Sequence, residues 1–275
     1  MNNIKNDLYK DQFSERHDLT TVDKPSKILI IASTPRCGSH MLGHALQTTN
    51  SFGFPLEYTN PRNLSQWKKR FGKKDFQEVL TEIQKCRTSP NGVFGIKIHY
   101  SHIKEYGGFV ALQEIFPEAY YVLLTRNDIL KQAISLAIAR RTGVWISGQK
   151  PVNENPEYHF LHIHKCLREL IIYNSSWRKT LKDNGCNYIE MNFDFVLKNI
   201  GASIQQIATF MDIEVNSETI PTEQVTKKQS NNINYEWEQR FLLDYQKDKT
   251  FLPIFHNQIN FLRKIKGQMK TLINA

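Results

Sequence analysis

The sequence predicts an α/β fold in which helices flank a central, mostly parallel β-sheet. Four short apolar runs rich in β-branched residues predict buried strands, and helical stretches separate these runs. Proline and glycine are scattered rather than gathered into a linker, and no internal repeat is visible. The chain has 275 residues, 40% of them hydrophobic, which is enough for one sizeable core. We therefore expect one domain over residues 27–250, a polar and mobile lead-in over residues 1–26, and a C-terminal amphipathic helix over residues 251–275.

The predicted strands are continuously apolar, as expected for strands that are covered on both faces. They span residues 27–33, 93–99, 120–126 and 188–192. The predicted helices span residues 38–48, 128–141 and 157–184. Because ligands of such sheets bind beyond the carboxyl ends of the strands, the residues at strand-to-helix junctions are the ones to examine.

The turn after the first strand has the composition of an anion site, and the next helix begins within it. Backbone N–H groups and the positive end of the helix dipole bind phosphate or sulfate at such turns. Gly38 lets the backbone approach the ligand, Arg36 adds a permanent charge, and Ser39 adds a hydroxyl. A plain strand-to-helix turn with an incidental arginine is the alternative. The candidate anion-binding residues are Thr34, Pro35, Arg36, Cys37, Gly38, Ser39 and His40.

The end of the third predicted strand is the second junction. Arg126 ends that strand, and Ser135 lies nine residues later on the following helix. Nine residues span about two and a half helical turns, so the two residues share an anion only if the chain turns before the helix begins. The alternative is a serine that packs among small residues against the sheet.

The charge balance predicts an anionic ligand without identifying it. Lysine and arginine number 36 against 27 acidic residues, a formal net charge of +9. No zinc-finger spacing or aromatic RNA-binding signature is present, so nucleic acid is not expected as a partner.

No apolar run approaches the ~20 residues of a membrane span. The polar N-terminus lacks the apolar core of a secretory signal, and a cytoplasmic location is expected. Four cysteines without a C-x-x-C pair predict reduced thiols.

Together the two junctions resemble the cytosolic sulfotransferases and, within that superfamily, the bacterial trehalose 2-sulfotransferase family over residues 27–245. The matching stretches are TPRCGS at 34–39, PLEY at 55–58, PNGVFGIK at 90–97, Arg126 with QAIS at 132–135, VW at 144–145, KQ at 228–229 and YEWEQR at 235–240. Cys37 departs from the family, which usually has serine or threonine there. The resemblance implies a P-loop-like sulfotransferase fold and a homodimer. It also implies in-line transfer from 3′-phosphoadenosine 5′-phosphosulfate (PAPS) to a hydroxyl or amine of a small-molecule or carbohydrate acceptor, without a metal.

The resemblance also implies how the donor is held. The turn after the first strand would grip the 5′-phosphosulfate, with Arg36 stabilising the leaving phosphate and the backbone N–H groups of residues 37–39 assisting. Arg126 and Ser135 would hold the 3′-phosphate, and Lys228 or the neighbouring Lys227 would join them from a late loop.

On the acceptor side, the resemblance makes Glu57 the general base. Lys97, within an apolar strand, needs an anionic partner and is a candidate second positive group near the acceptor, although its ammonium could also reach solvent at the strand end. Tyr58 and Trp145 are candidates to line the acceptor pocket. A surface loop glutamate and core aromatic residues are the alternatives.

Three other hypotheses remain open at this point. The anion site could belong to a nucleotide- or nucleic-acid-binding module without catalysis. The chain could also be a small-molecule kinase, although residues 34–40 lack the first glycine and the lysine of a nucleotide-hydrolysing P-loop. The C-terminal stretch, expected to pack on its own domain, could instead lie on a membrane or a second subunit.

The cluster of His159, His162, His164 and Cys166 fits an ordinary half-buried helix better than a metal site.

Overall fold

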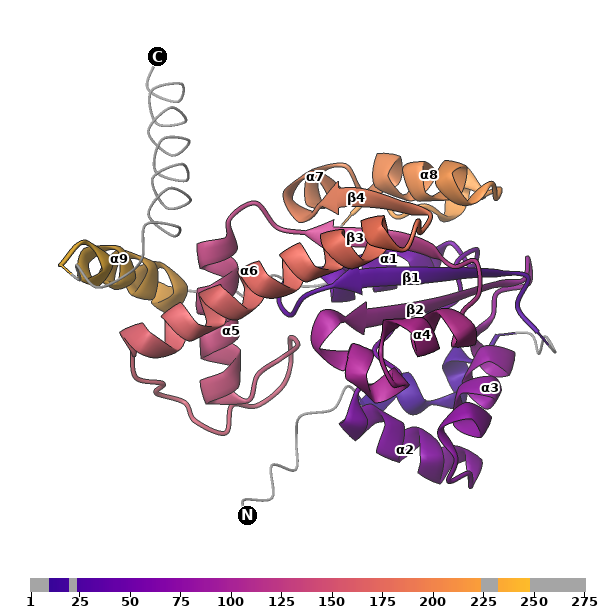
Figure 1. The fold of residues 1–275 in the computed structure, drawn as a ribbon, viewed down its shortest axis with the longest axis horizontal. Helices are drawn as coiled ribbons and strands as arrows, with labels where there is room; N and C mark the ends of the chain where they lie inside the picture. Colours follow the sequence, from indigo (N-terminus) through magenta and orange to yellow (C-terminus); the bar gives the residue numbers. More distant parts are fainter. Residues whose placement is uncertain (1–9, 20–23, 224–231, 248–275) are drawn as a thin grey trace.

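The computed structural model describes residues 10–19, 24–223 and 232–247 (Figure 1). Lys227, Lys228 and the predicted C-terminal helix over residues 251–275 lie outside the described residues. The sheet has four strands in the order β2-β1-β3-β4, and every pairing is parallel. The strands are β1 (Lys27–Ser33), β2 (Val93–His99), β3 (Tyr120–Thr125) and β4 (Tyr188–Asn192). The predicted α/β fold with a parallel sheet is confirmed, and three of the four strands have the predicted bounds.

The helices between β1 and β3 are α1 (Ser39–Thr48), α2 (Pro61–Phe71), α3 (Phe76–Arg87), η3 (Tyr100–Tyr106) and α4 (Phe109–Ile115). Those after β3 are α5 (Ile129–Thr142), α6 (Phe160–Asp183), α7 (Phe193–Lys198), α8 (Ile200–Met211), η4 (Ser217–Thr219) and α9 (Asn232–Lys247).

Helices cover both faces of the sheet, as Figure 1 shows. Ile28 and Ile30 of β1 enter one core with α2, α3, α4, α6 and η3, whereas Leu29 and Ile31 enter a second core with α1, α7 and α8. A third apolar cluster joins α5, α6 and α9.

The register of β1 against β2 positions two polar residues for the site. Lys97 lies beside Ile31, and His99 lies beside Ser33. Because side chains alternate between the faces of a strand, Lys97 and His99 point to the same face of β2. The chain before α2 adds to this edge of the sheet, since Leu56 forms a parallel bridge with Ile96.

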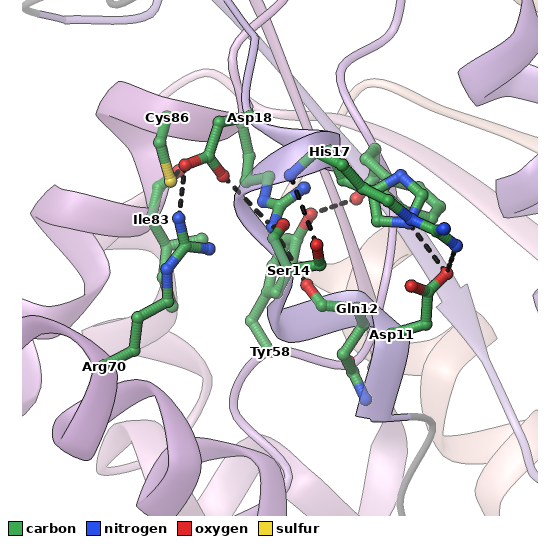
Figure 2. Close-up of polar contacts among 12 residues, drawn as sticks. Asp11, Gln12, Ser14, His17, Asp18, Tyr58, Arg70, Ile83 and Cys86 are labelled. Atoms are coloured by element: carbon green, nitrogen blue, oxygen red, sulfur yellow. Dashed lines mark hydrogen bonds and ion pairs between the residues drawn. The ribbon is translucent and has the colours of Figure 1, made fainter.

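The polar N-terminal segment folds onto the domain in its described part. The 3₁₀ helices η1 (Lys10–Phe13) and η2 (Glu15–His17) lie against α2 and α3, and Figure 2 shows the polar contacts that hold them. The fully buried Arg87 donates from Nη2 to the carbonyls of Gln12, at 2.9 Å, and Ser14, at 3.1 Å. Arg87 also lies 3.2 Å from Asp18 Oδ1, and the other oxygen of Asp18 pairs with Arg70. Residues 10–19 of the predicted lead-in therefore pack on the domain through polar contacts.

The cysteines and the lengths of the helices bear on two further sequence-based expectations. The four cysteines are free thiols, with Cys37 and Cys166 buried. Within the described ranges, no helix combines the length and the apolar character that a membrane span requires.

Candidate functional site

Both strand-to-helix junctions open into one cavity of about 1750 Å³ at the carboxyl ends of the strands. The first and third strands are neighbours in the sheet, so their carboxyl ends lie side by side although residues 36 and 126 are far apart in sequence. The predicted site residues that line this cavity are Pro35, Arg36, Gly38, Ser39, His40, Glu57, Lys97, Arg126, Ser135 and Trp145.

The turn between β1 and α1 has the backbone of an anion site. Gly38, the N-cap of α1, has a φ of 93° and places no side chain over the first turn of the helix. A Cβ there would lie 2.0 Å from the ring of Phe193, so only glycine fits. Arg36 also adopts a left-handed φ, 66°, which is uncommon outside glycine. The first-turn N–H groups of α1 therefore have no side-chain cap and lie beside the cavity-lining residues 38–40.

Two guanidinium groups flank this turn. Arg36 donates from Nε to Ser135 Oγ at 2.9 Å and from Nη1 to the carbonyl of Trp145. Burial, together with repulsion from Arg126, lowers the pKa of Arg36 to about 10. Arg126 lies over the ring of Phe193, and its buried Nε has no hydrogen-bond partner among the described residues. Because a buried donor normally has a partner, this arrangement suits a bound anion.

Helix α5 ties the two junctions together. Ser135, which was expected to act with Arg126, bonds directly to Arg36 and so links the second junction to the first. Gln132 is fully buried, and its Nε2 donates to Thr34 Oγ1 at 3.0 Å and to the carbonyl of Pro35 at 2.7 Å. Nothing in the sequence indicates this role beyond the position of Gln132 three residues before Ser135.

Two residues predicted to bind the donor point away from the cavity. Thr34 is fully buried and donates from Oγ1 to Asn174 Oδ1 at 3.2 Å. Cys37 is also fully buried, with its side chain in the core beside α1 and α8. The N–H of Cys37 is used within the turn, where it donates to the carbonyl of Thr34 at 3.4 Å. The prediction is therefore corrected for these two, and a thiol at residue 37 removes no hydroxyl from the cavity.

Close packing of the chain over β2 places Glu57 at the other side of the cavity. The backbone N–H of Lys97 donates to the carbonyl of Leu56 at 3.0 Å. A Cβ on Gly95 would lie 2.2 Å from the carbonyl of Phe52, so this approach requires glycine. Glu57 Oε1 then lies 2.8 Å from Lys97 Nζ and 3.0 Å from His99 Nε2.

This carboxylate is held in its ionised form. Burial alone would raise the pKa of Glu57, but the charges of His99 and Lys97 and the hydrogen bond from His99 hold it well below its usual range. The expectation that Lys97 needs an anionic partner is confirmed. Burial, with the charge of Lys97, lowers the pKa of the nearby His40 to about 2, and burial lowers that of His102 to about 4. Both imidazoles are therefore uncharged near neutral pH.

The two aromatic residues predicted to line the acceptor pocket differ in outcome. Trp145 lines the cavity, in the loop after α5. Tyr58 does not: it is fully buried in the core, its hydroxyl donates to the carbonyl of Phe54, and burial raises its pKa. Its neighbour Glu57 faces the cavity because successive residues of an extended segment point in opposite directions. That alternation was visible in the sequence and should have excluded Tyr58.

Metal binding gains no support from the described part of the chain, in which no three histidine, cysteine, aspartate or glutamate side chains are grouped to hold an ion. The helix that carries His162, His164 and Cys166 is α6. Arg141 donates to His162 Nδ1 at 3.3 Å, and Arg140 donates to Cys166 Sγ at 3.4 Å.

The family model, the relatives and the solved structure that this chain resembles are all described as sulfotransferases. A family model described as Stf0 sulphotransferase matches residues 28–244. A trehalose 2-sulfotransferase of Mycolicibacterium smegmatis is 22% identical over 265 residues, which covers 82% of this chain and 98% of the relative. A trehalose 2-sulfotransferase of Mycobacterium tuberculosis is 22% identical over 251 residues, covering 77% of this chain and 93% of the relative. Among solved structures, a mouse sulfotransferase complexed with PAP is similar, with a TM-score of 0.47, 11% identity, and coverage of 93% of this chain and 94% of that one.

Proposed function

The chain belongs to the Stf0 sulphotransferase family, and from this premise we propose that it transfers the sulfuryl group of PAPS to a hydroxyl or amine of a polar small molecule. The observation that carries the proposal is the cavity that joins two arginine-bearing junctions to a half-buried carboxylate, Glu57, paired with Lys97 and His99. A nucleotide with phosphates at both ends needs two cationic sites, and the acceptor needs a base near the sulfur.

We assign the donor contacts as follows. Arg36, with the N–H groups of the first turn of α1, faces the 5′-phosphosulfate and stabilises the charge that develops on the leaving phosphate oxygen. Arg126 and Ser135 face the 3′-phosphate. The uncapped N-terminus of α1 supports an anionic group at the 5′ end of the donor. The unpartnered Nε of Arg126 supports an anionic group at the 3′ end.

The transfer itself is a displacement at sulfur that balances without a metal. A bond forms between the acceptor oxygen or nitrogen and sulfur, the bond from sulfur to the 5′-phosphate oxygen breaks, and adenosine 3′,5′-bisphosphate (PAP) leaves. Glu57 takes the proton of the acceptor. Lys97, beside Glu57 and within the cavity, adds positive charge where the sulfonate crosses from donor to acceptor.

The acceptor end of the cavity is polar, which favours an acceptor with several hydroxyl groups, such as a carbohydrate. Near Glu57 several of the lining residues carry amide, hydroxyl, imidazole or guanidinium groups. They are Gln12, Asn60, Arg62, Asn63, Ser101 and His102. Both curated relatives are named for trehalose, a disaccharide, which supports the same class.

A transfer assay tests the proposal. Sulfur-labelled PAPS is incubated with the protein and separate acceptors: trehalose, glucose, glucosamine, a phenol and an aliphatic amine. We expect a labelled polar product and release of PAP, both unchanged by a chelator. Magnesium-dependent turnover of ATP, with no labelled product from PAPS, would instead support the kinase. Binding of PAP without transfer to any acceptor would favour a nucleotide-binding module.

A further inference from the structure

We propose that His99, held by Ser33, is a positioning residue that fixes Glu57 so that Oε2 is the atom that takes the acceptor's proton. The inference rests on the proposed function, in which Glu57 is the base. It is carried by a chain of two hydrogen bonds: Ser33 Oγ to His99 Nδ1 at 2.9 Å, and His99 Nε2 to Glu57 Oε1 at 3.0 Å.

The chemistry of the three groups fixes the ring. An ionised carboxylate only accepts hydrogen bonds, so the proton between His99 and Glu57 belongs to Nε2. Nδ1 then faces a hydroxyl, which donates to a neutral imidazole and accepts from a protonated one. His99 therefore keeps its bond to Glu57 in either protonation state, because Ser33 satisfies the opposite nitrogen in both.

Ser33 is itself rigidly held. It is the last residue of β1, it is fully buried, and its carbonyl accepts from Trp177 Nε1 at 2.9 Å. His99 is 6% exposed and lies beside Ser33 in the parallel register. Rotation of the almost fully buried His99 ring would break both hydrogen bonds and leave polar groups without their partners, which costs free energy.

The two oxygens of Glu57 consequently have different surroundings. Oε1 receives both Lys97 Nζ and His99 Nε2. Among the residues that the structure describes, Oε2 receives only a long contact of 3.4 Å from Asn60 Nδ2, and Asn60 lines the cavity. The proton of the acceptor therefore goes to Oε2.

The groups that face Glu57 come from several elements, and each affects its titration. Lys97 and His99 from β2 and His102 from η3 all lower the pKa of the carboxyl, whereas burial raises it. His40 of α1 also interacts with Glu57 and stays uncharged near neutral pH. Of the three histidines, His99 makes the hydrogen bond to Glu57, whereas His102 lies one step further away, with its ring 5.3 Å from that of His99. This difference makes His102 a matched control.

The test is a carbon NMR titration of the Glu57 carboxyl in the full chain without nucleotide, with Glu57→Gln used to assign the resonance. We expect His99→Leu to raise the titration midpoint by about one pH unit or more. Ser33→Ala should shift it in the same direction by less, His99→Gln should restore part of the original value, and His102→Gln should change it less than His99→Leu. A midpoint in His99→Leu within about 0.3 pH unit of the original protein would overturn the proposal.

Donor binding and kinetics separate this inference from the proposed function. PAP affinity, measured by calorimetry, should be unchanged in Ser33→Ala and His99→Gln, which also shows that both variants fold. Kinetics are measured with whichever acceptor the original protein sulfates in the transfer assay. His99→Leu should lower kcat with little change in the KM for PAPS. His99→Gln should recover part of kcat. Absence of PAP binding by the original protein would remove the sulfotransferase proposal yet leave the NMR result intact. Normal PAP binding with an unmoved Glu57 titration would remove only the role of His99.

Discussion

The charged residue Lys97 is almost fully buried at the edge of this cavity. Lys97 is 5% exposed, and its position within an apolar strand was enough to predict that it needs an anionic partner. The partner, Glu57, lies 40 residues earlier, and only the bridge between Leu56 and Ile96 brings the two together. The hydrogen bond between Ser33 and His99 could not be predicted because it depends on the register of β1 against β2, which the sequence does not state.

Replacing Glu57 by glutamine tests its role as a base. The amide keeps the shape of the side chain but cannot take a proton, so turnover should fall by about 10²-fold or more. The KM for PAPS and the affinity for PAP should change little. Glu78→Gln, a change at an exposed glutamate of α3, is the control and should leave turnover unchanged. Unchanged turnover in Glu57→Gln would exclude this residue as the base.

The same carboxylate makes stability depend on pH in a predictable direction. The pKa of Glu57 is lower in the folded protein than in the unfolded chain. Its contribution to stability is therefore fully present above the unfolded value, about 4.3, and is lost as the pH falls through the lower folded value. Urea unfolding of the original protein and of Glu57→Gln should show a stability difference that is constant near neutral pH and shrinks below about pH 4. A difference that grew on acidification would contradict the depressed pKa.

Secondary-structure elements differ in how well the sequence predicted them. The strands were found almost residue for residue, because short apolar runs bounded by polar turns have few alternative structures. The segment of residues 10–19 was not found, because it is polar and its polar groups become satisfied only when Arg87 and Arg70 surround Asp18. Hydrophobic periodicity carries no signal for such an element. Its placement shapes the cavity, since Gln12 from this segment lines the cavity and donates to Asn63.

A stability measurement tests how the N-terminal segment is attached. Asp18→Asn leaves the fully buried Arg87 without its anionic partner and should lower the free energy of unfolding by about 1–3 kcal/mol. Arg16→Ala is the matched control in the same segment, because Arg16 is 66% exposed in its pair with Asp11. That variant should change stability by less than about 0.5 kcal/mol in the same urea titration. Equal effects of the two substitutions would mean that the segment is not held through Asp18.

Across the whole molecule, the parallel topology decides where the chemistry occurs. The carboxyl ends of parallel strands lie at one edge of the sheet, and β1 and β3 are adjacent, so two arginines 90 positions apart in sequence reach the same cavity. The alternation of strands and helices predicted this convergence. The hydrogen bond between Ser135 and Arg36 was not predictable, because the sequence does not state how α5 packs against the first turn.

The most direct test of this convergence is a calorimetric comparison of three nucleotides: PAP, adenosine 5′-phosphate and adenosine 3′-phosphate. The original protein should bind PAP at least about tenfold more tightly than either monophosphate, a difference of about 1.4 kcal/mol. Arg126→Ala should lose the preference for PAP over adenosine 5′-phosphate, and Arg36→Ala should lose the preference for PAP over adenosine 3′-phosphate. Equal binding of all three nucleotides by the original protein, or loss of the same preference in both variants, would contradict a site that holds both ends of one nucleotide.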